Sequence, residues 1–194
     1  MDIIQLDQAV TLWINNLDTP VLYPLWYVLS DAKVWFPAYG LVMAFIIWKL
    51  GWKKGLIVVA SLIACVVLTD QLSGLVKSGF ERLRPCYNTW MIEHGIIMPY
   101  GQTAYLYGFF SSHAANVFGF AAASSLGLRL NGSQVKAFSW GVYIWAALVS
   151  LSRIMMAAHF LGDVLTGVVF GFVIGVAVAV VAHFIILWLF RQRS

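Results

Sequence analysis

The sequence predicts an all-α fold, a polytopic bundle of transmembrane helices, from its composition and from the length of its apolar runs. Of its 194 residues, 61% are hydrophobic and 10% are charged, whereas an average soluble domain carries about 25% charged residues. The mean hydropathy is +0.84, and several apolar runs are long enough to cross about 30 Å of hydrocarbon as helix. We therefore expect one integral-membrane domain over residues 1–194.

The apolar runs predict five spanning helices. Their ranges are residues 34–50, 56–76, 113–130, 138–157 and 163–190. Residues 21–30 contain Pro24 and are short for a crossing, so a sixth span built from them is the alternative. Residues 1–33 are otherwise expected to form an interfacial segment, and residues 82–110 a long outward loop.

The first residues predict an amphipathic helix that lies on the membrane surface. At helical spacing, Ile3, Leu6, Val10, Trp13 and Ile14 fall on one face, and Asp7, Gln8, Thr11 and Asn15 fall on the other. A helix of this kind buries its apolar face at the boundary between headgroups and acyl chains.

Three glycines along the last apolar run predict a close helix contact. Gly167, Gly171 and Gly175 recur every four residues, so they lie on one face of a helix. Small residues at this spacing let two helix backbones approach each other. We expect a neighbouring helix to pack closely against this strip.

The basic residues predict the orientation in the membrane. With five spans, one side collects Lys49, Lys53, Lys54, Arg129, Lys136, Arg191 and Arg193. By the positive-inside rule this side is cytoplasmic. We therefore expect a protein of the cytoplasmic (inner) membrane whose loop 82–110 faces outward, to the periplasmic or extracellular side.

A second group of ionisable residues lies on the expected outward side and needs another explanation. It comprises Lys77, Arg84, His113, Arg153, His159 and Asp163, in the segments KSGFERLRP, FSSH and SRIMMAAHFLGD. Ionisable residues at the edge of a bilayer are costly and are functional candidates by default. Three cations gathered there indicate an anion site, and a phosphate ester is the anion that we expect.

These segments resemble the motifs of the type 2 phosphatidic acid phosphatase superfamily, whose pattern is K-x6-R-P, P-S-G-H and S-R-x5-H-x3-D. The first block matches in full at Lys77, Arg84 and Pro85, the third in full at Ser152, Arg153, His159 and Asp163, and the second in part at Ser111 and His113. Phe110 and Ser112 replace the proline and glycine of the second block. Soluble vanadate-dependent haloperoxidases share the pattern, but five spans argue against that use.

The resemblance implies the catalytic residues. His159 would be the nucleophile that forms a phosphohistidine, and His113 the general acid that protonates the leaving group. Asp163 lies four residues after His159, one helical turn away, where it could accept a proton from one ring nitrogen and orient the other. The three residues would form the catalytic set.

The resemblance also implies a phosphate site without a metal or other cofactor. Lys77, Arg84 and Arg153 would bind the phosphate oxygens, with the arginines able to do so in bidentate fashion. Ser111 and Ser112 stand where a helix is expected to begin, and a helix N-terminus attracts anions through its free N–H groups and its dipole.

Three polar residues near these motifs have two interpretations each. Asp70 either tunes Lys77 or is a packed, hydrogen-bonded carboxyl. Asn116 either orients the ring of His113 or bonds to a neighbouring helix. Arg82 either meets a lipid headgroup or faces water.

The predicted function is a membrane lipid phosphatase that cleaves a phosphomonoester or diphosphate. By the resemblance, its substrate is undecaprenyl diphosphate, a lipid A phosphate, phosphatidylglycerol phosphate or phosphatidic acid, and the sequence does not choose among them. The alternative is a non-enzymatic lipid or anion carrier that binds a headgroup through its cations. We expect contact with membrane lipids, no nucleic acid, and no obligate protein partner.

Overall fold

The computed structural model describes residues 2–101 and 105–190, and its regular elements in these ranges are all helices. They are α1 (Ile3–Asn15), η1 (Pro20–Leu22), α2 (Tyr23–Ser30), η2 (Ala32–Trp35), α3 (Phe36–Phe80), η3 (Pro85–Tyr87), α4 (Thr89–Glu93), α5 (Ser112–Leu130), α6 (Lys136–Met155) and α7 (Leu161–Phe190). The predicted all-α class is confirmed. Arg191 and Arg193, counted above among the basic residues, lie outside the described residues.

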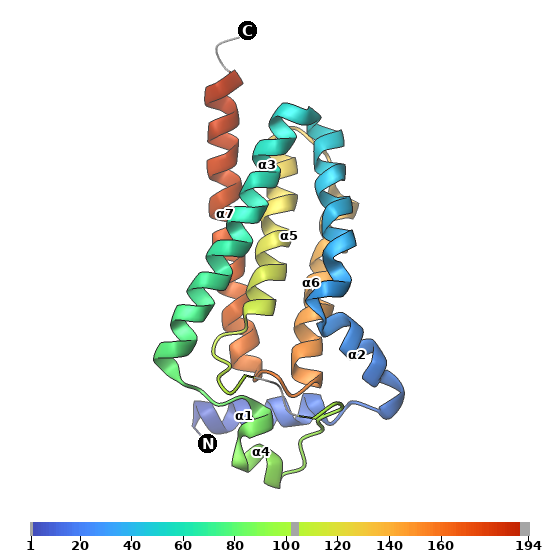
Figure 1. Ribbon diagram of the computed structural model, residues 1–194, viewed down its shortest axis with the longest axis vertical. Helices are drawn as coiled ribbons and strands as arrows, with labels where there is room; N and C mark the ends of the chain where they lie inside the picture. The colour runs from blue at the N-terminus through green and yellow to red at the C-terminus, as the bar shows by residue number, and fades with distance from the viewer. Residues whose placement is uncertain (1, 102–104, 191–194) are drawn as a thin grey trace.

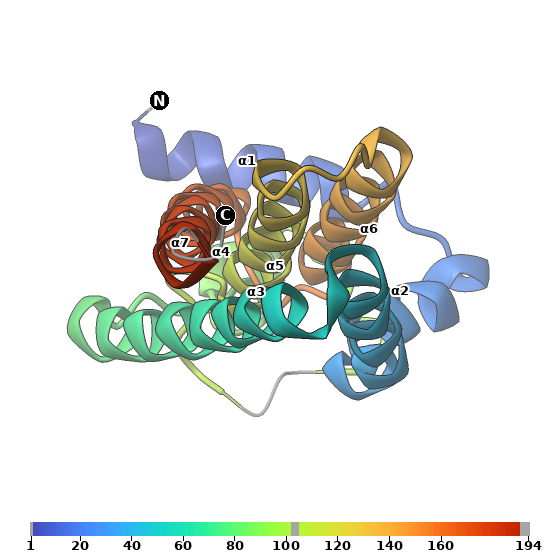
Figure 2. The ribbon, with the colours of Figure 1, turned by 90° about the horizontal axis from the view of Figure 1, so that it is seen from above.

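The long helices form an elongated bundle with α5 at its centre (Figures 1 and 2). Helix α3 folds back on itself at Gly51, whose φ of 75° and ψ of 160° are not helical. Glycine adopts such a positive φ without steric cost. The two limbs of α3 therefore correspond to the predicted spans 34–50 and 56–76.

Three helical stretches in the described residues are long and apolar enough to cross a membrane, namely Ala32–Phe80, Lys136–Met155 and Leu161–Phe190. The first of these contains both limbs of α3. Helix α5 is less apolar because it is surrounded by α3, α6 and α7, and much of its surface is buried against them (Figure 2). The protein is an integral membrane protein, and the number of crossings stays a prediction.

Helix α2 occupies the segment that was the alternative sixth span. Its 8 residues cover about 12 Å as a helix, well short of the hydrocarbon thickness. It packs instead against α6, at the end of the bundle that also carries α1 and α4 (Figure 1). The predicted loop 82–110 reaches the same end and contains the short helices η3 and α4.

The glycine strip of α7 packs directly on α5. A Cβ atom on Gly171 would lie 2.1 Å from the carbonyl oxygen of Ala115, and one on Gly167 would lie 2.5 Å from that of Ser111. Both distances are shorter than any real carbon–oxygen contact. The predicted close helix approach is thus confirmed, and it brings the start of α5 against the start of α7.

Helix α1 is amphipathic as predicted, and its polar face is turned toward the protein. Thr11 and Asn15 are fully buried, while Ile3 is 82% exposed and Trp13 is 66% exposed. The Asn15 amide donates to the carbonyl oxygens of Ile154 and of its neighbour Met155, at the end of α6. The last carbonyls of a helix lack partners within it, so α1 satisfies them while its apolar face stays free.

Candidate active site

The predicted site residues meet at the end of the bundle that carries α1 and α4. A cavity of about 610 Å³ is lined there by Asp70, Gly74, Lys77, Ser78, Arg84, Tyr105, Leu106, Tyr107, Ser112, His113 and Arg153. Five of the eight predicted site residues line this cavity. The other three, Ser111, His159 and Asp163, are buried in the protein beside it.

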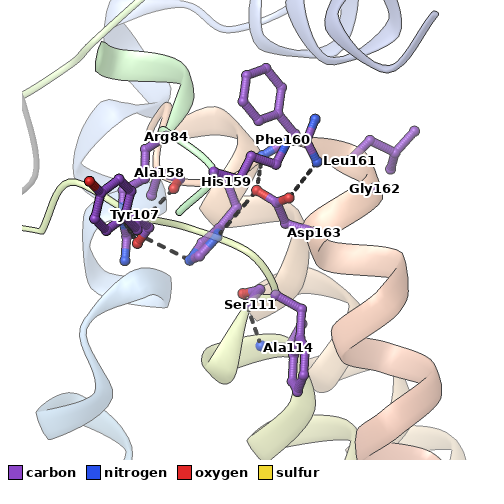
Figure 3. A network of polar contacts seen from close by, with 12 residues as sticks. Arg84, Tyr107, Ser111, Ala114, Ala158, His159, Phe160, Leu161, Gly162 and Asp163 are labelled. Carbon is purple, nitrogen blue, oxygen red and sulfur yellow. Dashed lines mark hydrogen bonds and ion pairs between the residues drawn. The ribbon is translucent and has the colours of Figure 1, made fainter. Parts of the chain in front are cut away.

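His159 is positioned by the short loop between α6 and α7. Helix α6 ends at Met155, two residues before the predicted end, and Ala157 takes a left-handed φ of 52°. The backbone N–H groups of Ala158 and His159 both donate to the carbonyl oxygen of Arg153. This compact turn carries the imidazole back toward Arg84, as Figure 3 shows.

The imidazole of His159 has a defined tautomer. Arg84 Nη1 lies 3.3 Å from His159 Nε2, and a guanidinium can only donate, so Nε2 accepts and the ring proton is on Nδ1. Burial and the cations around it, Arg84 first, then Arg153 and Lys77, hold the pKa of His159 well below its ordinary value. The ring is therefore neutral, with its lone pair on the nitrogen that faces Arg84.

Asp163 lies on the expected side of His159, at a longer distance than expected. Its Oδ2 atom is 3.7 Å from His159 Nδ1, beyond hydrogen-bond range. Oδ2 instead accepts from the backbone N–H of Phe160 at 3.0 Å (Figure 3). The backbone of Gly108 also lies beside His159 Nδ1 and interacts with the ring. The carboxylate faces the ring without bonding to it.

Arg82 connects Asp163 to the N-terminal helix, a relationship that neither interpretation of Arg82 anticipated. Its Nη1 atom donates to Asp163 Oδ1 at 2.6 Å, and its Nη2 atom donates to Asp7 Oδ2 at 2.7 Å. The guanidinium carbon lies 4.3 Å from the centre of the Phe160 ring. The headgroup and water interpretations are both wrong, because Arg82 is engaged by two carboxylates.

Asp7 and its neighbour Thr11 extend this connection to the start of α7. Asp7 Oδ1 accepts from the backbone N–H of Gly162 at 2.8 Å, and Thr11 Oγ1 accepts from that of Leu161 at 2.9 Å. These N–H groups belong to the first turn of α7, where no partner exists within the helix. The only sequence signal for this role was the polar face of α1, which did not reveal its partners.

Each of the three predicted cations donates hydrogen bonds to a different part of the protein. Lys77 Nζ donates to Ser112 Oγ at 3.0 Å. Arg84 donates to the carbonyl oxygens of Tyr107 and Ala158, both at 3.1 Å. Arg153 donates to the hydroxyl and carbonyl oxygens of Ser30, at the end of α2. All three cations line the cavity, so it presents fixed N–H donors to an anion.

The altered second block is accommodated by the surrounding helices. Ser111 caps α5 by accepting from the backbone N–H of Ala114 at 3.4 Å, and its own N–H donates to the Asp163 carbonyl oxygen at 3.0 Å (Figure 3). Phe110 is buried and stacks on Phe170 of α7, with ring centres 5.0 Å apart. Ser112, in place of glycine, supplies the hydroxyl that Lys77 contacts.

The structure also decides between the two interpretations of Asn116 and of Asp70. The Thr69 hydroxyl bonds to Asn116 Oδ1, which joins α3 to α5 and confirms the helix-to-helix interpretation. Asp70 is exposed and lines the cavity. It forms no hydrogen bond or ion pair with any described residue. The interpretation of Asp70 as a packed, hydrogen-bonded carboxyl is therefore wrong. Its charge acts on Lys77 over a longer range, which supports the interpretation that Asp70 tunes that cation.

Comparison with known proteins gives a family match and related chains. The model of the PAP2 superfamily matches residues 54–187. A lipid A 4′-phosphatase of Porphyromonas gingivalis is 28% identical over 174 residues, which cover 89% of this chain and 71% of the relative. A lipid A 4′-phosphatase of Bacteroides thetaiotaomicron is 24% identical over 167 residues, covering 86% of this chain and 72% of the relative.

Two solved structures share the fold. The crystal structure of Aquifex aeolicus LpxE superposes with a TM-score of 0.66 at 20% identity, covering 88% of this chain and 92% of the other. A transmembrane PAP2-type phosphatidylglycerolphosphate phosphatase from Bacillus subtilis superposes with a TM-score of 0.69 at 20% identity, covering 92% and 85%. At this level of identity the likeness concerns the arrangement of the helices.

Proposed function

Because the chain belongs to the PAP2 superfamily and is a membrane lipid phosphatase of that type, we propose that it works through a phosphohistidine on His159, without a metal. The observation that carries this proposal is the neutral imidazole, whose Nε2 lone pair faces Arg84 at the edge of a cationic cavity. A nucleophile needs a free electron pair. The buried ring keeps one next to the group that would bind phosphate.

The phosphate of the substrate would bind between Lys77, Arg84 and Arg153. Its oxygens would take the donors that these cations present to the cavity, together with the N–H groups in the first turn of α5. Charge that grows on the transferring oxygens is stabilised by donors already in place. To admit the phosphate, Arg84 would transfer its Nη1 donor from His159 Nε2 to a phosphate oxygen.

Phosphoryl transfer would then proceed in two steps. His159 Nε2 attacks phosphorus, the bond from phosphorus to the leaving oxygen breaks, and its electron pair stays on that oxygen, which takes a proton from His113. A water then attacks the phosphohistidine while it gives a proton to His113, and the bond from phosphorus to nitrogen breaks to release phosphate. His113 lines the cavity, where either proton could be exchanged.

Asp163 would act when the ring of His159 becomes positively charged. Formation of the Nε2–phosphorus bond leaves the proton on Nδ1 and makes the imidazole a cation. The carboxylate lies 3.7 Å from that atom, so a shift of roughly 1 Å would create a charge-assisted hydrogen bond. An interaction that strengthens only as the reaction advances favours the transition state.

A lipid A phosphate is the substrate that we favour among the four lipid classes. Both curated relatives bear the name lipid A 4′-phosphatase and cover most of this chain. The basic residues around positions 49–54 and 129–136 lie at the end of the bundle opposite α1 and α4 (Figure 1). By the positive-inside rule, this arrangement supports an active site at the outer face of the cytoplasmic membrane.

The test is phosphate release by the purified protein in detergent with a chelator present. The four lipid classes are supplied in turn, with His159→Ala as the inactive variant and His94→Ala, in the exposed part of the loop, as the matched control. We expect release that requires His159 and survives chelation, and an acid-labile phosphoenzyme after rapid quenching. Release that disappears with the chelator would overturn metal independence, and lipid binding without release would favour the carrier.

A further inference from the structure

Asp70 is a carboxylate without a direct hydrogen bond or ion pair to a described residue, in the part of α3 that is expected to cross the membrane; its charge acts on Lys77 from a distance. It is exposed, and no described residue bonds to it. An ionisable side chain at membrane depth is costly and usually serves a ligand. Asp70 precedes Lys77 by seven residues, which is about 10 Å along a helix. It therefore lies deeper in the membrane than the cationic end of the cavity.

Asp70 also lines a second cavity, of about 210 Å³, that shares part of its wall with the first. The residues that line it are Leu29, Ser30, Ala32, Trp35, Tyr39, Asp70, Ser112, His113, Asn116, Val117 and Val149. Asp70, Ser112 and His113 line both cavities. The second cavity, called here the Asp70 pocket, thus begins at the proposed general acid and continues beyond it.

The leaving group of the proposed reaction should extend into the Asp70 pocket. His113 must reach the oxygen that departs, so this oxygen and the group bonded to it lie next to His113. In a phosphorylated glycolipid, the sugar stands between the terminal phosphate and the acyl chains. The pocket lies on the same side of the phosphate site, toward the membrane interior.

The lining of the Asp70 pocket selects the chemistry of that leaving group. A carboxylate accepts hydrogen bonds and repels anions, so Asp70 disfavours a second phosphate and favours hydroxyl or amide donors. The rings of Trp35 and Tyr39 offer flat apolar surface for the C–H face of a sugar. Asn116, which bonds to Thr69, adds a polar amide to the wall of the pocket.

We propose that the Asp70 pocket holds the amino sugar that carries the phosphate, and that Asp70 accepts a hydrogen bond from a sugar hydroxyl or amide N–H. This inference rests on the proposed lipid phosphatase function and adds the part of the site that selects the headgroup. Asp70 is a specificity residue, because it acts on the substrate far from phosphorus. Phosphatidic acid has a diacylglycerol leaving group without a further free hydroxyl, so it cannot donate a hydrogen bond to Asp70.

The experiment compares kcat and KM of Asp70→Ala and Asp70→Asn on two substrates, a glucosamine-based lipid phosphate and phosphatidic acid. We expect Asp70→Ala to lower kcat/KM for the glycolipid by roughly 10- to 100-fold, the usual effect of losing a hydrogen bond to a charged group. The value for phosphatidic acid should change less than about twofold, and Asp70→Asn should be intermediate on the glycolipid. Gln71→Ala, at the next and also exposed position, is the matched control.

An equal loss on both substrates would overturn the proposal, because it would show that Asp70 acts on Lys77 or on stability. An unchanged glycolipid value would overturn it as well. Should the wild-type protein release no phosphate from any lipid, the proposed function itself fails, and binding of the dephosphorylated glycolipid decides the inference. That binding, followed by tryptophan fluorescence, should weaken in Asp70→Ala, and equal binding would exclude the pocket.

Discussion

The guanidinium of Arg82 donates to Asp163 at 2.6 Å and thereby fixes the carboxylate that faces His159. The other oxygen of Asp163 is held by the backbone of Phe160. Both oxygens of this buried carboxylate are therefore positioned before any substrate arrives. A carboxylate that is already directed at the ring needs only a small movement to bond to it once the ring becomes charged, which favours catalysis.

Arg82→Gln should lower kcat more than it raises KM. The substitution removes the cation that orients Asp163, and losing a group that orients a reacting residue costs roughly 10- to 100-fold in activity. The Arg82 side chain is 26% exposed, so water will replace part of the lost interaction. Steady-state kinetics on a lipid phosphate measure the effect, and Arg82→Lys should retain part of the activity. A rise in KM alone would mean that Arg82 binds substrate.

Asp7→Asn should act in the same direction as Arg82→Gln, with a smaller effect of roughly two- to tenfold on kcat. Asp7 does not reach His159, and it acts only by holding Arg82 and the first turn of α7. The double variant should therefore be little worse than Arg82→Gln, because the two residues belong to one network. Fully multiplicative losses would show that Asp7 acts independently of Arg82. Asp2→Asn, at the exposed start of α1, is the control.

His113→Gln should accumulate phosphoenzyme when the leaving group needs no proton. With an aryl phosphate such as p-nitrophenyl phosphate, transfer to His159 can occur without an acid, whereas attack by water still needs a proton acceptor. We expect a burst of about one nitrophenolate per enzyme followed by slow turnover, monitored by stopped-flow absorbance. A slow phase without a burst would place His113 outside the second step.

His159 should stay neutral at pH values where an ordinary histidine is charged. Burial and Arg84 lower its pKa from an ordinary value of about 6.5, so the neutral form persists as the pH falls below that value. The unfolded chain binds the proton there and the folded chain does not, so stability decreases as the pH falls through about 6.5. NMR titration of labelled histidine rings measures this, and Arg84→Gln should raise the midpoint. A wild-type midpoint at or above 6.5 would contradict the prediction.

Gly171→Ala should destabilise the bundle, whereas Gly141→Ala should not. The new methyl group would collide with the Ala115 carbonyl, and overpacking of this kind costs about 1–3 kcal/mol or more. A Cβ atom on Gly141 of α6 would have no other described residue within 4 Å, and alanine is the better helix former. Unfolding in mixed detergent micelles compares the two variants. Equal stability would mean that α5 and α7 can separate without cost.

The helices and the motif residues could be predicted because they depend on local signals. The apolar runs predicted the two limbs of α3 and most of α7. The three short motifs predicted that Lys77, Arg84 and His113 share one site, and all three line one cavity. The bond between Arg82 and Asp7 could not be predicted, since 75 positions separate the two residues and spacing along a helix carries no information at that range. The distance from Asp163 to His159 was missed because the turn at Ala157 displaces the ring from simple helical geometry.

Helix α1 also constrains the order in which the protein can mature. Its Asp7 binds Gly162 across 155 positions of the chain, and synthesis proceeds from the N-terminus. During translation the bond from Gly162 to Asp7 can therefore form only after the start of α7 has been synthesised, and until then water binds the polar face of α1. Hydrolytic competence should appear only then, so a stalled or truncated nascent chain would not consume membrane lipids.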